Sequence, residues 1–358
     1  MGDATDEITC EEQGRAGLVR LTRPKELNAL TLDMIRALDA FKHRCAKNPH
    51  IYGIVQEAEG KAFCAGGDIR LIRKLVQDQP EEADRYYAVE YQHNWTLQCF
   101  RKPHISLMNG ITMGGGAGIS LYGTHRVAGE NLSFAMPETA IGFFPDVGTS
   151  WFLPRMPGKM GLYLALTGHV CRRADSYYLG IATHCIPAGK FEAIKAAMIE
   201  AEPIDAILDG LHESPGKSEL EALRVPIDRI FSAATFDDVL SGLEREDGAW
   251  RDWARETLER LSKRSPLSLK VTFELQKRGK DFRSLKEALT VEYRVATHLI
   301  RQHDFAEGVR AVVVDKDQSP RWQPATLEEV DDALVQAMFQ RPPGGDITLQ
   351  DYWSPPQS

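Results

Sequence analysis

The sequence of 358 residues contains no run of about 18 consecutive apolar residues, the length that an α-helix needs to cross a bilayer. This absence argues against a membrane-spanning chain. Cysteine is also scarce, and the spacing of the six cysteines matches neither a zinc site nor a redox pair. We therefore expect reduced thiols and no bound metal.

Basic residues are fewer than acidic ones, 43 against 51, which gives a formal net charge of -8. A general nucleic-acid surface needs a basic patch, so we expect no nucleic-acid partner. The opening stretch MGDATDEITC carries acids where a signal or transit peptide would carry basic residues. On these grounds the sequence predicts a cytoplasmic protein. The composition, 43% hydrophobic and 26% charged, is typical of a globular chain.

Strands alternating with helices predict an α/β architecture in the first half of the chain. The helical stretch at 31–46 has Met34, Leu38, Phe41 and Cys45 on one face, and Thr31 stands where a helix cap is expected. Short apolar segments flanking it have the pattern of strands. These expected strands cover residues 17–22, 52–58, 104–110 and 124–129.

Beyond about residue 190 the pattern becomes helical and rich in charge. Two stretches carry capping-box spacing, Ser284 with Glu287 and Thr326 with Glu329, and each predicts a helix start. Because 358 residues exceed the size at which one core usually stops growing, we expect two parts. They are a core domain over residues 1–200 and a helical region over 201–358 that completes a pocket or makes oligomer contacts.

Two acids stand out in the stretch FAMPETAIGFFPDVGTSWFLPR, residues 134–155. Glu138 and Asp146 lie eight positions apart among apolar side chains, glycines and prolines. Burying an unpaired carboxylate is costly, so these acids either cap local turns at the surface or take part in chemistry. Each follows a proline, which also suits an acid in a first helical turn or a tight turn.

Two glycine clusters, Gly66 with Gly67 and residues 114–116, each follow an apolar segment. Glycine lets a backbone N–H approach a ligand without a Cβ in the way, and helix starts leave such groups unpaired. The two clusters could together hold one oxyanion. The alternative is that they serve tight turns and close helix–strand packing.

The segments AFCAGGDI, NGITMGGGAGIS and FAMPETAIGFFPDVG resemble the three signature segments of the crotonase, or enoyl-CoA hydratase and isomerase, superfamily. Within it, MPETAIGFFPDVG and HDFAEGVRAVVVDKDQSPRW resemble the hydrolase branch that acts on 3-hydroxyisobutyryl-CoA. The resemblance covers roughly residues 8–335. It implies a crotonase-type spiral of repeated strand-strand-helix units, with an appended C-terminal helical region.

The resemblance also implies a coenzyme A thioester as substrate, with its carbonyl oxygen between the N–H groups of Gly67 and Gly115. Hydratases of the superfamily carry one glutamate at the position of Gly118 and a second at that of Glu138. Here the first is missing. Asp146 stands where the hydrolase branch has its aspartate, so the resemblance favours thioester hydrolysis of a 3-hydroxyacyl-CoA.

In that reaction Glu138 either attacks the thioester carbonyl or deprotonates a water, and the sequence leaves both routes open. Asp146 would accept a hydrogen bond from the 3-hydroxyl and influence the protonation of Glu138. The resemblance places Glu90 in contact with substrate, and Lys25 and Arg70 beside the coenzyme A phosphates. No cofactor is implied beyond the coenzyme A that the substrate carries.

Three functions are compatible with these residues. The leading one is the hydrolase, which in organisms with the family enzyme is a step of valine breakdown. The second is a hydratase or isomerase of a short-chain enoyl-CoA that uses Glu138 with Asp146. The third is a non-catalytic RNA-binding protein, against which the net charge of -8 argues. The superfamily also suggests a possible homo-oligomer.

Overall fold

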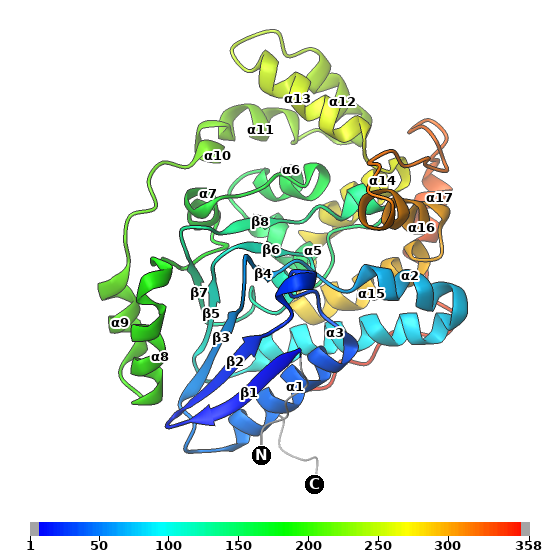
Figure 1. Cartoon of the computed structure of the whole chain (residues 1–358). Coiled ribbons are helices and arrows are strands. Elements are labelled where there is room, and N and C mark those ends of the chain that lie inside the picture. Colours follow the sequence, from blue (N-terminus) through cyan, green and yellow to red (C-terminus); the bar gives the residue numbers. More distant parts are fainter. Residues whose placement is uncertain (1–6, 352–358) are drawn as a thin grey trace.

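The computed structural model describes residues 7–351 as a mixed α/β protein built around two sheets (Figure 1). The larger sheet has the order β1-β2-β3-β5-β7-β9 and the smaller one β4-β6-β8. The strands are β1 (Ile8–Gln13), β2 (Ala16–Leu21), β3 (Gly53–Ala58), β4 (Ala62–Cys64), β5 (His104–Met108), β6 (Ile111–Met113), β7 (His125–Ala128), β8 (Ser133–Ala135) and β9 (His184–Cys185).

The chain winds through the two sheets as a spiral. Strands β3 and β4, β5 and β6, and β7 and β8 follow one another, and each pair gives its first strand to the larger sheet and its second to the smaller. Among the named strands of residues 7–351, the pairings between successive turns are parallel, and β1 with β2 is the only antiparallel pair. The expected spiral of strand-strand-helix units is therefore confirmed.

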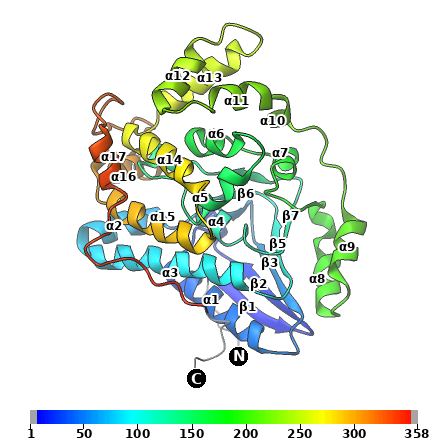
Figure 2. The same ribbon diagram turned by 180° about the vertical axis from the view of Figure 1, so that it is seen from behind.

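The helices surround these sheets and dominate the second half of the chain (Figures 1 and 2). The α-helices are α1 (Leu32–Lys47), α2 (Ile69–Asp78), α3 (Pro80–Cys99), α4 (Gly115–Gly118), α5 (Thr149–Phe152), α6 (Met160–Thr167), α7 (Arg173–Tyr178), α8 (Phe191–Ile199), α9 (Ile204–Leu211), α10 (Glu219–Ala222), α11 (Arg224–Ile230), α12 (Phe236–Glu244), α13 (Arg251–Ser262), α14 (Pro266–Gly279), α15 (Leu285–Leu299), α16 (His303–Val309) and α17 (Asp332–Ala337). Short 3₁₀ turns are η1 (Pro24–Glu26), η2 (Glu138–Ile141), η3 (Leu153–Arg155) and η4 (Ala188–Lys190), and η5 (Arg310–Val314) is a π-helical turn.

Helix α1 has the capping and the buried face that its sequence predicts. The Thr31 hydroxyl accepts a hydrogen bond from the Met34 N–H at 3.3 Å. Met34, Leu38, Phe41 and Cys45 are all buried in the main core. The four expected strands are present as β2, β3, β5 and β7, with ends shifted by one or two residues, because local periodicity specifies an element better than its boundary.

The helix start expected at Thr326 was wrong. Glu329 instead accepts a hydrogen bond from the Ala325 N–H, and the Val330 N–H donates to the Leu327 carbonyl, so this stretch forms a turn. The following helix, α17, begins after Asp331, whose carboxylate accepts from the Leu334 N–H at 2.7 Å. The Ser284 cap is confirmed, since its hydroxyl accepts from the Glu287 N–H at 3.2 Å.

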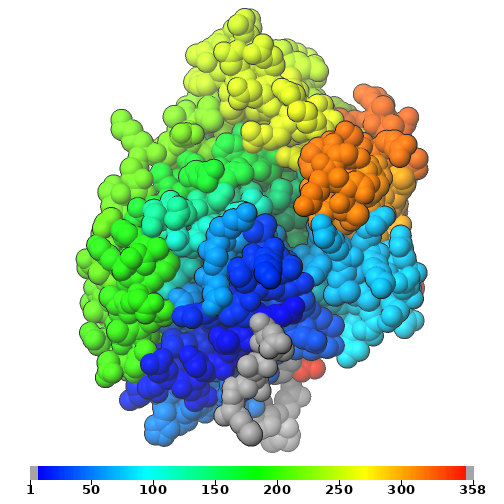
Figure 3. Space-filling model, in the orientation of Figure 1, coloured from blue at the N-terminus to red at the C-terminus, as the bar shows by residue number. Residues whose placement is uncertain are grey.

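The C-terminal helices return to the N-terminal half of the chain. Helix α15 packs along α3, and α16 packs on α2 (Figure 2). In the space-filling view the segment around 303–314, in orange, lies directly against the light-blue residues of α2 (Figure 3). Arg70 and Arg73 of α2 donate to the carbonyls of Val313 and Ala306. Within residues 7–351 we find no helix with the length and apolarity to span a bilayer.

Candidate active site

A cavity of about 180 Å³ lies between α2, α3, α4 and η2, and Val312 and Val313 of η5 close one side of it. Five residues predicted from the sequence line this one cavity, although the chain separates them by up to 79 positions. They are Gly67, Glu90, Gly115, Glu138 and Asp146. The spiral brings them together because Gly67, Gly115 and Glu138 follow β4, β6 and β8, the neighbouring strands of the smaller sheet, while α3 carries Glu90 past the same edge.

The N–H groups of Gly67 and Gly115 have no acceptor among residues 7–351. Gly67 forms a parallel bridge with Leu30, in which the Gly66 carbonyl and the Asp68 N–H make the hydrogen bonds. The N–H of Gly67 itself therefore points away from Leu30. Gly115 opens α4, where first-turn N–H groups lack helical acceptors. A Cβ built on Gly115 would lie 3.3 Å from the Gly67 nitrogen, so the two donors are close neighbours.

A side chain at either glycine would collide with a neighbouring side chain. A Cβ on Gly67 would lie 2.7 Å from the Tyr86 hydroxyl, and a Cβ on Gly115 would lie 2.7 Å from Glu90 Oε1. Both contacts are shorter than real Cβ atoms make. Glycine is therefore needed at both positions for close packing, and the same packing keeps Glu90 beside one of the two donors.

The three acids of the cavity are buried and do not cap surface turns. Glu90, Glu138 and Asp146 are 4%, 7% and 5% exposed. In the described part of the chain, Glu90 Oε1 and Glu138 Oε2 have no hydrogen-bond partner. Burial, and then the charge of Asp146, raises the pKa of Glu138 well above its ordinary value, and the same two causes raise that of Glu90. Like charges in one apolar cavity cannot all ionise.

Asp146 accepts a hydrogen bond from a neighbouring side chain. The Tyr91 hydroxyl donates to Asp146 Oδ2 at 2.9 Å. Burial raises the pKa of Asp146 to about 7, although the Tyr91 hydrogen bond opposes the rise. Tyr91 lies on α3 one position after Glu90, so one helix supplies both an acid and the residue that holds another acid.

A buried glutamate that sequence reasoning missed holds the turn after Asp146. Val147 and Gly148 have φ angles of +53° and +84°, in the left-handed region. Glu292 of α15 is fully buried, and its carboxylate accepts from the N–H groups of Gly148 at 2.6 Å and Ser150 at 2.9 Å, and from the Ser150 hydroxyl at 2.5 Å. The available signal was its helical spacing among apolar residues of α15.

Gly118 does not line the cavity. A Cβ at this position would lie 2.7 Å from Asn94 Nδ2 and 2.9 Å from the Val147 Cβ. The space in which a hydratase-like glutamate would start is therefore filled by α3 and by the turn after Asp146. The packing leaves no space for this acid, which the sequence also lacks.

Lys25 and Arg70 lie outside the cavity lining. Arg70 is on α2, and its guanidinium donates to the carbonyl of Val313, a cavity residue, at 2.5 Å. Lys25 is exposed on η1. Contacts of these two residues with the coenzyme A phosphates stay predictions.

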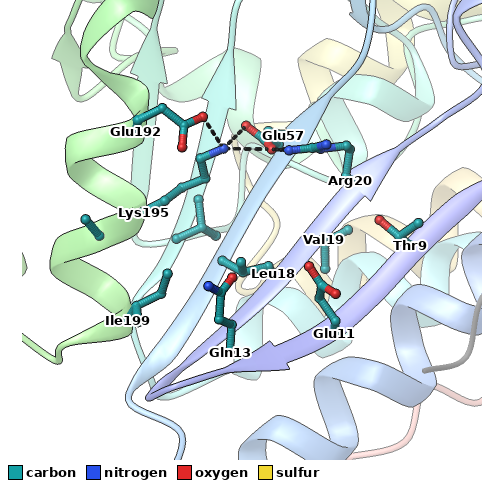
Figure 4. A pocket seen from close by; sticks show the side chains of 12 residues that line it. Thr9, Glu11, Gln13, Leu18, Val19, Arg20, Glu57, Glu192, Lys195 and Ile199 are labelled. Atoms are coloured by element: carbon teal, nitrogen blue, oxygen red, sulfur yellow. Dashed lines mark hydrogen bonds and ion pairs between the residues drawn. The ribbon is translucent and has the colours of Figure 1, made fainter. Parts of the chain in front are cut away.

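A second hollow, of about 280 Å³, lies on the outer face of β1, β2 and β3 beside α8 (Figure 4). Four of its charged side chains, Arg20, Glu57, Glu192 and Lys195, are paired with one another. Lys195 contacts both oxygens of Glu57 at 3.0 Å and Glu192 at 2.6 Å, and Arg20 contacts Glu57 at 2.7 Å. We therefore assign these groups to the packing of α8 on the sheet.

Comparison with known proteins agrees with this geometry. Residues 16–339 match the family model described as enoyl-CoA hydratase/isomerase. The mitochondrial 3-hydroxyisobutyryl-CoA hydrolase of Homo sapiens is 41% identical, covering 96% of this chain and 91% of its own length. The 3-hydroxyisobutyryl-CoA hydrolase 1 of Arabidopsis thaliana is 38% identical over 94% of this chain and 92% of its own.

Two solved structures superpose closely. A carnitinyl-CoA dehydratase from Mycobacterium thermoresistibile has a TM-score of 0.91 at 35% identity, with 97% of this chain and 99% of that chain covered. An enoyl-CoA hydratase from Rhodobacter sphaeroides 2.4.1 has a TM-score of 0.88 at 35% identity, with 96% and 99% covered. These likenesses extend over the C-terminal helices as well as the spiral.

The expectation of a cytoplasmic protein was wrong. The relatives from Homo sapiens, Danio rerio, Xenopus tropicalis and Gallus gallus are all named as mitochondrial. The error came from reading a compartment out of missing basic residues in ten positions, of which the first six lie outside the described residues. An absence in one short stretch does not specify a compartment.

From the match over residues 16–339 and the identity over nearly the whole chain, we conclude that the protein belongs to the enoyl-CoA hydratase/isomerase family, the crotonase superfamily.

Proposed function

We propose that the protein hydrolyses the thioester of 3-hydroxyisobutyryl-CoA to 3-hydroxyisobutyrate and coenzyme A, a step of valine breakdown. The observation that carries this proposal is that Glu138, Asp146 and two glycine N–H groups without an acceptor among the described residues meet in one cavity. The names of the curated relatives support the same reaction and the same substrate.

The N–H groups of Gly67 and Gly115 would bind the thioester oxygen. This oxygen gains negative charge when the carbonyl is attacked, and donors fixed in the backbone stabilise that charge without rearranging. Removal of one such donor typically raises a barrier by about 2.7–4 kcal/mol. Glu90, packed against Gly115, would line the substrate on the same side.

Glu138 would carry the hydrolysis by one of two routes. As a nucleophile, its carboxylate forms a bond to the acyl carbon, the C–S bond breaks, coenzyme A leaves as thiolate, and water cleaves the resulting anhydride. As a general base, it takes a proton from the water that attacks the carbonyl. Both routes need Glu138 ionised, and within the described residues no hydrogen bond occupies its Oε2 atom.

Asp146 would accept a hydrogen bond from the 3-hydroxyl of the acyl group. Its contact with Tyr91 fixes the carboxylate, and its charge influences the protonation of Glu138. Asp146 would therefore both contact the acyl group and influence the protonation state of Glu138.

The hydratase or isomerase alternative is supported by the two superposed structures, which are named as a dehydratase and a hydratase. The packing around Gly118 weighs against it, because water addition across a double bond uses a second acid on the other side of the water. Asp146 would have to take that place.

Release of free thiol decides between the two reactions. The protein is incubated with 3-hydroxyisobutyryl-CoA and, separately, with crotonyl-CoA, and thiol and enoyl absorbance are both followed. We expect thiol from the hydroxy ester and little change in crotonyl-CoA. Loss of enoyl absorbance without thiol would establish the alternative.

The route taken by Glu138 is tested by trapping. An anhydride on Glu138 is reduced by borohydride to an alcohol, which changes the mass of the peptide that contains this residue. The general-base route leaves the peptide mass unchanged during turnover.

We also propose the division into residues 1–200 and 201–358. It is supported by Val312, Val313 and Glu292, which all belong to the second part and contribute to the site. In this arrangement the substrate is an acyl-CoA and no further cofactor is needed. A homo-oligomer stays a prediction.

A further inference from the structure

Tyr87 is a cavity residue for which the proposed reaction has no role. It lies on α3, on the same helical face as Glu90 and Tyr91, at positions i, i+3 and i+4. The residue is 3% exposed and lines the cavity beside the three acids.

The hydroxyl of Tyr87 differs from those of the two tyrosines next to it on the helix. Tyr86 donates to the Leu30 carbonyl at 3.0 Å, and Tyr91 donates to Asp146 at 2.9 Å. Within residues 7–351 the Tyr87 hydroxyl makes no hydrogen bond. It is also absent from the polar atoms that are fully sealed from solvent, so it opens into the cavity.

The ring of Tyr87 is held from several sides. Its centroid lies 5.4 Å from that of Phe143, 5.7 Å from that of Tyr86 and 5.9 Å from that of Tyr91. Contacts of this kind leave little freedom to turn the ring. The hydroxyl is therefore a fixed group that has an open position in front of it.

The surroundings make this hydroxyl a donor. Burial first, and then the charges of Asp146, Glu90 and Glu138, raise the pKa of the phenol well above its ordinary value, so the proton stays on the oxygen. The other polar groups of the lining are the carboxyls and the two backbone N–H groups that would face the thioester oxygen. A substrate hydroxyl that gives its proton to Asp146 still needs a donor for its own oxygen.

We propose that the Tyr87 hydroxyl donates a hydrogen bond to the oxygen of the substrate's 3-hydroxyl, and that this contact makes the site selective for 3-hydroxyacyl thioesters over unsubstituted ones. The inference rests on the proposed thioesterase function. A site built to bond a hydroxyl discriminates strongly against an analogue that lacks it, because its own polar groups are then left unpaired.

The test compares two thioesters on two proteins. Thiol release from 3-hydroxyisobutyryl-CoA and from isobutyryl-CoA is measured for the unmodified protein and for Tyr87→Phe, which removes one oxygen atom and keeps the ring contacts. We expect the ratio of the two kcat/KM values to fall roughly tenfold or more in Tyr87→Phe. The loss should be confined to the hydroxy substrate.

Tyr178→Phe is the matched control, because Tyr178 lies on α7 away from the cavity lining. It should leave the ratio unchanged. An unchanged ratio in Tyr87→Phe would overturn the inference, and so would an equal loss on both substrates, which would indicate a structural role. If the unmodified protein releases thiol from neither ester, the proposed function itself fails, and the two failures are thereby distinguished.

Discussion

Two of the cavities in the described part of the chain are lined by charged groups, five beside α8 and three between α2 and α4, but they arrange them in opposite ways. In the hollow beside α8, each buried or half-buried charge contacts an opposite one, as Lys195 does with Glu57. In the cavity between α2 and α4, three carboxyls face one another without a basic partner in its lining. Arg264 is the cation that acts on Glu138, and its influence is smaller than those of burial and Asp146.

This difference separates a stabilising arrangement from a reactive one. Opposite charges in contact satisfy one another and need no ligand. Buried like charges raise each other's pKa and leave hydrogen-bonding positions open, which is the condition for proton transfer and for binding polar groups of a substrate. The size of a hollow alone does not distinguish the two, since the paired one is larger, at about 280 Å³ against 180 Å³.

The largest expected effect comes from removing the central acid. Glu138→Gln keeps the size of the side chain but supplies neither a base nor a nucleophile, so thiol release from 3-hydroxyisobutyryl-CoA should fall by roughly 10²–10⁴-fold. Circular dichroism and thermal unfolding should show a folded protein. A folded variant of normal activity would contradict the role given to Glu138.

Glu292→Gln should have the next largest effect, although Glu292 lies outside the cavity lining. An amide presents one acceptor and one donor, so either the Gly148 or the Ser150 N–H would face a donor and the turn after Asp146 would shift. We expect kcat to fall by about 10–100-fold, since misplacement by about 1 Å can cost that much.

Glu292→Asp and Glu287→Gln serve as comparisons for Glu292→Gln. The shorter acid keeps both acceptor atoms and should recover part of the rate. Glu287 lies in the first turn of the same helix, outside the cavity lining. Equal rates for Glu292→Gln and the unmodified protein would show that the turn does not depend on this carboxylate.

Glu57→Gln should lower the stability of the protein and leave its rate of thiol release unchanged, the opposite of what we expect for Glu138→Gln. Lys195 and Arg20 would lose the charge that both contact, so the free energy of unfolding should fall by about 1–3 kcal/mol. The rate of thiol release per folded molecule should not change. Denaturant unfolding and active-site-normalised kinetics measure the two quantities, and a loss of kcat here would mean that the two cavities are coupled.

The smallest expected effect is a shift in the pH dependence of kcat/KM. Burial raises the pKa of Asp146 to about 7, and its charge then contributes to the raised pKa of Glu138. Because Glu138 must be ionised to react, kcat/KM should increase with pH, with a midpoint well above the ordinary range of a glutamate. Asp146→Asn removes the like charge, so the residual activity should reach its plateau at a lower pH. A midpoint that stays in place would show that burial alone raises the pKa of Glu138.

Much of the site could be predicted before the structure was known. Glu138, Asp146, Gly67 and Gly115 stand in long ordered segments, and they line one cavity. The elements around them followed from local patterns, such as the cap at Thr31. Tyr87, Tyr91 and Glu292 were missed because each looks like an ordinary residue on the apolar face of a helix.

The sequence by itself determined the family, the spiral of strands and helices, and the acids of the site. Only the tertiary structure decided that Glu90 and Glu138 have oxygens without a partner among residues 7–351, that Tyr91 and Glu292 hold Asp146 and its turn, and that charges beside α8 are paired. The physical reason is that helix caps and periodicity depend on neighbours a few residues away. Burial, pairing and pKa depend on side chains brought together from distant parts of the chain.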